Sequence, residues 1–247
     1  MKAELHCGDC LKVMKEIKPK SVDLILADLP YGTTRRNEWD IVIPFKSLWE
    51  GYERIIKDNG VIALFGDEPF ASKLRLSNEK LYRYDWIWIK SSPTGFLNAK
   101  KMPLKNTETI SIFYKKLPLY NPQMRSGKPY IRKKGTTSLN YGKADKDTVT
   151  VNHGTRYPVK TINFKSTRHS TKRFTHPTQK PVDLLEYIIK TYTNEGMTVL
   201  DNVMGSGSSG VAAINLKRNF IGIEKDPKFY QFAEQRIMKA KQEILLV

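Results

Sequence analysis

A carboxylate, a proline and an aromatic ring follow the first strongly apolar segment of the sequence. The apolar segment spans 21–27, and Asp28-Leu29-Pro30-Tyr31 comes directly after it. Proline has no backbone N–H and a restricted φ, so it ends sheet pairing and stiffens the turn. The turn then holds the Asp28 carboxylate and the Leu29 carbonyl as hydrogen-bond acceptors, and Tyr31 offers a ring face. Two acceptors beside an aromatic ring suit a flat base that carries an amino group.

A glycine-rich loop nearer the C-terminus is the second group of residues with chemical potential. Residues 205–210 (Gly-Ser-Gly-Ser-Ser-Gly) match G-x-G-x-x-G between a predicted strand and a predicted helix. Glycines let the backbone turn sharply and approach a ligand closely. An acid at the end of the following strand, here Glu224, can accept both hydrogen bonds of a ribose diol. The pattern predicts a site for an adenosine-containing cofactor, and a glycine-rich turn that binds nothing is the alternative.

Asp201, which ends the strand before this loop, distinguishes between two classes of cofactor. Its negative charge opposes a pyrophosphate at the helix N-terminus but suits an ammonium or sulfonium group. The stretch from Asp201 to Gly207 is seven residues long, longer than the turn of the dinucleotide fingerprint. Both features favour S-adenosylmethionine over NAD. An NAD-dependent oxidoreductase stays open as an alternative from another class of enzyme.

The segments that must position these residues alternate between strand and helix patterns. Residues 45–60 have apolar side chains at helical spacing and end in Asn59-Gly60, a natural C-terminal stop. Strands alternating with helices predict an α/β fold with a mostly parallel sheet. Ligands bind beyond the carboxyl ends of such strands, so Asp28 and the glycine loop share one crevice if their strands are neighbours. Further helices are predicted at 181–193, 211–218 and 227–242, and strands at 21–28, 61–65, 84–90, 109–115, 197–201 and 219–224.

Positive charge is concentrated in the middle of the sequence. The 247 residues include 42 Lys and Arg against 25 Asp and Glu, a net charge of +17. Residues 98–173 contain 18 of the basic residues and only 3 acids, an excess of 15 with tyrosines interspersed. Cations for phosphates and aromatic rings for stacking are what a nucleic-acid surface needs. The alternative is a solvated basic loop, and the composition does not distinguish DNA from RNA.

The sequence disfavours a membrane protein and a metal-binding protein. The sequence has no run of about 18 apolar residues, and its N-terminal segment lacks the apolar core of a signal peptide, so we expect a soluble, intracellular protein with no membrane partner. Cys7 and Cys10 form a single C-x-x-C pair, which is half of a zinc site, so no metal is expected.

The motifs and their order resemble the DNA methyltransferases that modify exocyclic amines. The family's catalytic signature is Asp, Asn or Ser, then Pro-Pro, then Tyr or Phe, and residues 28–31 match it with Leu29 in place of the first proline. The family's cofactor motif, F-x-G-x-G, is similar to 203–207 (VMGSG). The catalytic motif comes first, the basic region next and the cofactor motif last. This order resembles the circularly permuted arrangement called the β group.

The resemblance implies a Rossmann-like methyltransferase sheet with a basic target-recognition insertion. Residues 1–98 would form the catalytic half of the core, 99–173 the target-recognition region and 174–247 the cofactor-binding half. The implied activity is transfer of a methyl group from S-adenosylmethionine to the exocyclic amine of a base flipped out of double-stranded DNA. A nucleic-acid-binding protein on a degenerate methyltransferase scaffold is the alternative without catalysis.

The resemblance also implies roles for the residues of the catalytic motif. Asp28 and the Leu29 carbonyl would accept the two amine protons, Pro30 would fix their placement, and Tyr31 would stack on the base. An acid at the first position resembles the adenine-N6 members, whereas cytosine-N4 members tend to carry Ser there. Adenine N6 is therefore the expected target, and cytosine N4 is the alternative.

The resemblance assigns further residues to the cofactor and to DNA. Asp9, in the stretch His-Cys-Gly-Asp, would contact the adenine of the cofactor, and a helix N-cap is its alternative role. Homodimerisation and a cognate restriction endonuclease are candidate partnerships, in the cytoplasm of a bacterium or from a phage. The expected cofactor-binding residues are Asp9, Asp28, Thr178, Gln179, Lys180, Asp201, Gly205, Gly207 and Glu224. The expected DNA-binding residues are Lys100, Lys101, Arg132, Lys133, Lys134, Arg156, Arg168 and Arg173.

Overall fold

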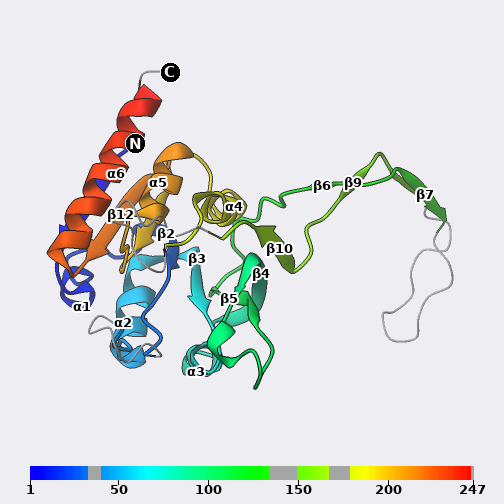
Figure 1. Ribbon diagram of the computed structural model, residues 1–247. Coiled ribbons are helices and arrows are strands. Elements are labelled where there is room, and N and C mark those ends of the chain that lie inside the picture. The colour runs from blue at the N-terminus through cyan, green and yellow to red at the C-terminus, as the bar shows by residue number, and fades with distance from the viewer. Residues whose placement is uncertain (33–39, 134–148, 167–178, 246–247) are drawn as a thin grey trace. The chain divides into compact units, whose positions relative to one another are not determined.

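The structure, a computed structural model, describes residues 1–32, 40–133, 149–166 and 179–245 (Figure 1). The chain divides into two compact units, one formed by Met1–Asn121 with Lys160–Val247 and the other by Pro122–Val159. Within the described ranges, no helix combines the length and the apolar character needed to cross a membrane.

An eight-stranded sheet organises the first unit. Its strand order is β1-β12-β11-β2-β3-β5-β4-β10, and only β5 runs antiparallel to its neighbours, β3 and β4. The other neighbouring pairs are parallel, which confirms the predicted α/β fold with a mostly parallel sheet. The strands are β1 (Ala3–Cys7), β2 (Val22–Ala27), β3 (Ile56–Gly66), β4 (Tyr82–Thr94), β5 (Lys105–Phe113), β10 (Thr161–Phe164), β11 (Thr198–Asp201) and β12 (Asn219–Glu224).

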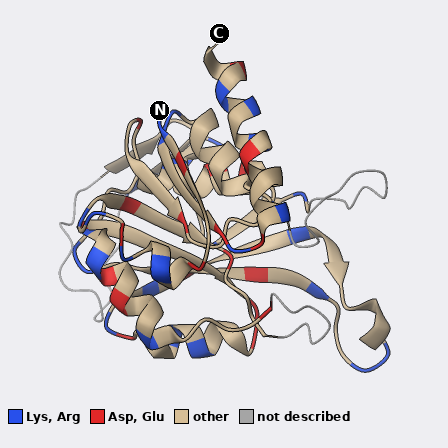
Figure 2. Cartoon of the chain, turned by 90° about the vertical axis from the view of Figure 1, so that its left-hand side faces the viewer, with Lys and Arg blue, Asp and Glu red and all other residues tan. Residues whose placement is uncertain are grey.

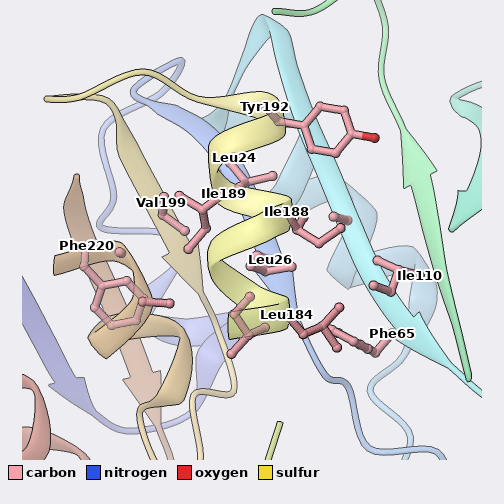
Figure 3. Close-up of a cluster of buried hydrophobic side chains, with 14 of the residues drawn as sticks. Leu24, Leu26, Phe65, Ile110, Leu184, Ile188, Ile189, Tyr192, Val199 and Phe220 are labelled. Atoms are coloured by element: carbon pink, nitrogen blue, oxygen red, sulfur yellow. The ribbon is translucent and has the colours of Figure 1, made fainter. Parts of the chain in front are cut away.

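Helices cover both faces of this sheet, which explains why its central strands read as continuous apolar runs. Leu24 and Leu26 of β2 belong to one apolar cluster, whereas Ile25 and Ala27 belong to another on the opposite face. Figure 3 shows α4 lying over the first of these clusters. Charged residues lie mainly on helices and loops, and the strands of the central sheet are mostly uncharged (Figure 2). The first cluster packs against α4 (Val182–Tyr192), α5 (Ser208–Asn215) and α6 (Pro227–Leu245), and the second against α1 (Cys10–Val13), α2 (Phe45–Ile55) and α3 (Phe70–Ser77).

The helix predicted at 45–60 ends earlier than expected. Helix α2 stops at Ile55, and Asn59-Gly60 lies inside β3, so the predicted stop signal is wrong. Ile56 takes an extended conformation, is 8% exposed and pairs with β2, so burial against the sheet overrides the helical pattern. At Gly60, an added Cβ would lie 2.9 Å from the Asp23 carbonyl, because the two strands shift register there.

The predicted region 99–173 does not coincide with one structural unit. Strand β5 lies inside the main sheet between β3 and β4, and β10 forms its edge beside β4. Ile110 and Ile112 of β5 are fully buried. The separate unit is Pro122–Val159. The predicted bounds differ because they followed the excess of cations, which does not indicate which residues belong to the main sheet.

Two short antiparallel strand pairs make up the second unit. Strand β6 (Arg125–Ser126) pairs with β9 (Thr155–Arg156), and β7 (Tyr130–Lys133) pairs with β8 (Val149–Asn152). Arg156 links the two pairs: its guanidinium lies 4.6 Å from the centre of the Tyr130 ring and donates to Asn152 Oδ1 at 2.5 Å. The described part of this unit has no buried core, and its β-branched residues Ile131 and Val151 are 73% and 53% exposed.

Candidate active site

The two motifs meet at one edge of the sheet. Strand β2, which precedes Asp28, pairs in parallel with β11, which ends at Asp201 and leads into the glycine loop. The two strands are therefore neighbours, as the shared crevice requires. Glu224 ends β12, which lies beside β11 in the sheet. It pairs with Cys7 of β1, and Asp9 follows Cys7 by two residues. Four carboxylates thus follow the carboxyl ends of four adjacent parallel strands, where ligands of such sheets bind.

A buried network of charges surrounds Asp28. The Lys180 Nζ lies 2.6 Å from Asp28 Oδ2 and 2.8 Å from Glu108 Oε1. The Tyr31 hydroxyl donates to Asp28 Oδ1 at 2.7 Å and lies 2.9 Å from Glu108 Oε1. Lys90 pairs with the second Glu108 oxygen at 2.7 Å. Two lysines and two carboxylates therefore balance each other's charges beside the catalytic motif.

The two carboxylates of this network differ in basicity. Burial raises the pKa of Asp28, the Lys180 ammonium opposes that rise, and the charge of Glu108 adds to it. Burial alone would also raise the pKa of Glu108, but Lys180 and Lys90 outweigh it and lower that pKa to about 2. The two carboxylates raise the pKa of Lys180 although burial opposes this. Glu108 is thus firmly ionised, and Asp28 is the more basic of the two.

Lys180 contacts the catalytic motif, whereas the sequence predicts it as a cofactor-binding residue. Its ammonium joins Asp28 and Glu108 and lies 5.0 Å from the centre of the Phe65 ring. The physical reason is the position of α4, which begins two residues later and whose Leu184 belongs to the same apolar cluster as Phe65 (Figure 3).

No strong sequence signal marks Glu108 or Lys90 as members of this network. They come from the antiparallel strands β5 and β4, and β4 brings Trp88 opposite Glu108. Glu108 is 5% exposed. The available signal was that Glu108 is one of only three acids among the 18 cations of 98–173 and lies in a strand-like stretch. An acid buried among cations is paired with some of them.

The rest of the catalytic motif is held firmly. The Leu29 side chain is 3% exposed and belongs to the second apolar cluster. The Tyr31 ring stacks on Phe70 with centroids 4.9 Å apart and an interplanar angle of 23°. Pro30 lies between them and is half-buried. Anchoring on both sides fixes the backbone from which the Leu29 carbonyl and the Asp28 carboxylate project.

The glycine loop is braced by the acids on either side of it. The Glu224 carboxylate accepts the N–H of Gly205 at 2.8 Å and that of Asp226 at 2.8 Å. Burial raises the pKa of Glu224. Gly207 precedes α5 with φ +74°, and an added Cβ would lie 2.8 Å from the Ala233 Cβ of α6. Glycine at this position therefore serves both the left-handed backbone and close helix packing.

Asp201 also holds the loop. Its carboxylate accepts the N–H of Val203 at 3.0 Å and the Ser209 hydroxyl at 2.5 Å. Burial is the main reason that its pKa is raised to about 7, with the charges of Asp28 and Glu224 adding to it. Both of its oxygens therefore have partners inside the loop.

The remaining expected cofactor residues are placed as follows. Asp9 caps α1 by accepting the N–H groups of Leu11 and Lys12 at 3.0 and 3.3 Å, which is the alternative role that the sequence left open. Gln179 is partly buried beside Lys180, and Thr178 lies outside the described residues.

The expected DNA-binding residues fall in separate places. Lys100 and Lys101 are exposed on the hairpin between β4 and β5 of the first unit. Arg132 and Lys133 are exposed on β7 of the second unit, whereas Arg156 is engaged in the internal contacts of that unit. Lys134, Arg168 and Arg173 lie outside the described residues.

The two cysteines are free thiols. Cys7 is exposed, Cys10 is buried and neither forms a disulfide. In the described ranges, no group of three or more His, Cys, Asp or Glu side chains is arranged to hold a metal ion.

Comparison with known proteins agrees with this geometry. The Type II methyltransferases M2.LlaDCHI of Lactococcus lactis subsp. cremoris and M2.DpnII of Streptococcus pneumoniae are each 28% identical to the chain. The matches cover 94% and 93% of this chain and 88% and 87% of the relatives.

Two solved structures share the fold. The M1.HpyAVI–SAM complex superposes with a TM-score of 0.65 at 24% identity, over 95% of this chain and 98% of the other. The cytosine-N4-specific PvuII DNA methyltransferase gives 0.66 at 16% identity, over 99% and 93%. The model of the N6/N4 methyltransferase family, described as DNA methylase, matches residues 22–235. The chain therefore belongs to this family of DNA methylases.

Proposed function

We propose that the chain transfers a methyl group from S-adenosylmethionine to the exocyclic N6 amine of an adenine in DNA. The observation that carries this proposal is the pairing of β2 with β11, which sets the acceptors of Asp28 and Leu29 beside the glycine loop. The Type II methyltransferase names of two relatives and the SAM complex of a solved neighbour support the reaction and the cofactor.

The residues along the sheet edge fit this cofactor chemically. We assign the ribose hydroxyls to Glu224, at the end of the strand next to the loop, and the adenine amine to Asp9, which follows the neighbouring strand β1. Gly205 and Gly207 would let the loop backbone approach the methionine part of the cofactor, and Gln179 would contact its carboxylate, a role that we also propose for Thr178. Asp201 and Glu224 supply carboxylates at this edge that, when ionised, attract a sulfonium and an ammonium. The same charge repels a pyrophosphate, which disfavours NAD.

The catalytic motif activates the amine. The lone pair of an exocyclic amine is delocalised into the ring, which makes the nitrogen a poor nucleophile. Hydrogen bonds to its two N–H protons help the nitrogen become tetrahedral, so that the lone pair is available for attack. The Leu29 carbonyl and the Asp28 carboxylate accept these two protons, and their anchored backbone keeps them in place. Asp28, as the more basic carboxylate, takes the proton that the amine releases. When bound, the cofactor supplies an electrophilic methyl group on its sulfonium.

Lys180 controls the basicity of Asp28 in this scheme. Before substrate binds, its ammonium and the Tyr31 hydroxyl satisfy the Asp28 oxygens. Glu108 shares that ammonium, so Lys180 keeps a partner when the amine takes its place at Asp28. Tyr31, with Phe70 on one ring face, offers the other to the base.

The choice of adenine rests on the first residue of the motif. Asp28 resembles the adenine-N6 members, and the cytosine-N4 alternative is kept because a cytosine-N4-specific enzyme shares the fold. The β-group assignment rests on motif order alone. Cytoplasmic location in a bacterium or phage-infected cell, a homodimer and a cognate restriction endonuclease complete the proposal.

Recognition of double-stranded DNA is assigned to the second unit. The β7–β8 pair is an antiparallel ribbon with Arg132 and Lys133 on its surface, and a two-stranded ribbon fits the major groove of B-form DNA.

Methyl transfer to unmethylated genomic DNA, with the product nucleosides separated by mass spectrometry, tests this function. The proposal expects N6-methyladenine that requires both S-adenosylmethionine and the protein. N4-methylcytosine would overturn the choice of base and keep the reaction class. Methyl transfer to RNA instead of DNA would overturn the proposal that DNA is the substrate.

A further inference from the structure

The hairpin between β4 and β5 presents apolar side chains to solvent. The 3-10 turn Phe96–Asn98 leaves Phe96 65% and Leu97 102% exposed, and Met102 follows at 51%. Single exposed apolar residues are ordinary, but three of them within seven residues concentrate apolar surface at one turn. We name residues 95–102 the hairpin tip.

The hairpin tip has a defined backbone. The N–H groups of Asn98 and Met102 donate to the carbonyls of Gly95 and Asn98 at 2.9 and 3.0 Å. Gly95 has φ +91°, which allows the sharp turn. Thr94 and Lys105 pair across the base of the tip. The apolar side chains are therefore held on a closed turn.

Charge at the hairpin tip indicates the partner. Lys100 and Lys101 are exposed on it, next to the apolar side chains. A nucleic-acid duplex has phosphates outside and stacked apolar bases inside, so it matches a tip that combines cations with apolar side chains. Proteins that insert Phe, Leu or Met between base steps unstack the bases and kink the duplex.

Sheet register places the hairpin tip at the edge that carries Asp28. The last residue of β3, Gly66, pairs with Thr109 of β5, and β5 runs antiparallel to β3. The start of β5 therefore projects beyond the carboxyl end of β3, the edge that Asp28 reaches from β2. Glu108, which lies 2.9 Å from the Tyr31 hydroxyl, is three residues after Lys105 at the base of the tip, or about 10 Å along the strand.

We propose that Phe96 and Leu97 enter the duplex beside the target base and fill the space that the flipped base leaves. The inference rests on the proposed function, because a wedge is useful only to an enzyme that must extrude a base from a paired stack. Lys100 and Lys101 hold the phosphates on either side of the entry point. The hairpin tip thus lowers the cost of flipping, while residues 28–31 receive the base.

The double variant Phe96→Ala/Leu97→Ala tests the wedge on two substrates. The first is a fully paired duplex, and the second has an abasic position opposite the target base, so that no pair must be broken. Because flipping costs more from a paired stack, we expect the variant to lose about tenfold or more in single-turnover rate on the first substrate and little on the second. Leu76→Ala/Leu117→Ala is the matched control, because these residues are 68% and 83% exposed elsewhere on the first unit.

A second measurement does not depend on turnover. With 2-aminopurine at the target position, wild-type protein should raise the fluorescence on flipping, and the tip variant should reduce that rise on the paired duplex alone. Equal losses on both substrates, or no loss at all, would overturn the wedge. If the tip variant sediments as a monomer and wild-type protein as a dimer, the wedge would also be overturned, because Phe96 and Leu97 would then form a contact between two copies of the chain. Failure of wild-type protein to methylate either duplex would instead count against the proposed function.

Discussion

Lys180 and Asp28 are 152 residues apart in the sequence, yet the Lys180 Nζ lies 2.6 Å from Asp28 Oδ2. Asp28 follows β2, and Lys180 precedes α4, which packs across that strand. The same ammonium contacts Glu108, so a single lysine sets the charge balance between the two carboxylates. The basicity of Asp28 therefore depends on residues outside the motif that contains it.

Replacing Lys180 with Met should shift the acid limb of the pH–rate profile to higher pH. Without the ammonium, burial and the charge of Glu108 raise the pKa of Asp28 further, so more of Asp28 is protonated at neutral pH. Turnover at pH 7 should fall by about tenfold or more and recover partly as pH rises. Lys190→Met, on the exposed face of α4, is the control, and a profile unchanged in shape would exclude this role of Lys180.

Replacing Glu108 with Gln should shift the same limb in the opposite direction. Glu108 raises the pKa of Asp28, so loss of its charge lets Lys180 lower that pKa, and the limb moves to lower pH. The variant also leaves the partly buried Lys90 without its carboxylate, which should cost about 2 kcal/mol of unfolding free energy. Rate profiles and denaturant unfolding measure the two effects, with Asp58→Asn as an exposed control. A shift in the same direction as Lys180→Met would contradict the charge balance.

Asp201 should make stability fall as pH rises. Its pKa is raised to about 7 in the folded protein, above the value of about 3.9 of an unfolded chain. The stabilising contribution is therefore complete below about pH 4 and is lost as pH rises through about 7. In cofactor-free protein, the unfolding free energy of wild type minus that of Asp201→Asn should decrease by on the order of 4 kcal/mol from pH 4 to pH 8. A difference that stays constant with pH would show that Asp201 is ionised throughout.

The ribbon of the second unit should contribute to the salt dependence of DNA binding. Arg132→Gln/Lys133→Gln removes two exposed cations from β7. If both contact phosphates, the slope of log K against log salt should become shallower by about 2. Filter binding across a salt series measures the slope, with Lys228→Gln/Lys239→Gln on α6 as control. Equal slopes for the ribbon variant and wild type would place the DNA elsewhere.

The sequence predicted most of the sheet because its buried strands are short apolar runs between turn residues. β2, β11 and β12 fall within about one residue of their expected ends, and the neighbouring positions of β2 and β11 satisfy the condition for a shared crevice. The predicted helix at 45–60 was too long because Ile56 fits the apolar face of a helix as well as a strand. Only the pairing of Ile56 with β2 decides between the two.

The charge network could not be predicted because its members come from four separate segments. Lys90 and Glu108 lie on two antiparallel strands that precede the second unit in the sequence. Lys180, which contacts Glu108, follows that unit. Spacing along the chain gives no information about such contacts. As one of only three acids in the basic region, Glu108 is expected to be paired, but the sequence does not identify its partners.

Single-turnover methyl transfer by Asp28→Asn tests the central claim most directly, when cofactor affinity is measured on the same protein. Asn keeps the size of the side chain and removes the charge that receives the amine proton. The account predicts that transfer to DNA falls by about 1,000-fold while cofactor affinity changes by less than tenfold. Transfer at the wild-type rate would contradict it and would remove Asp28 from the reaction.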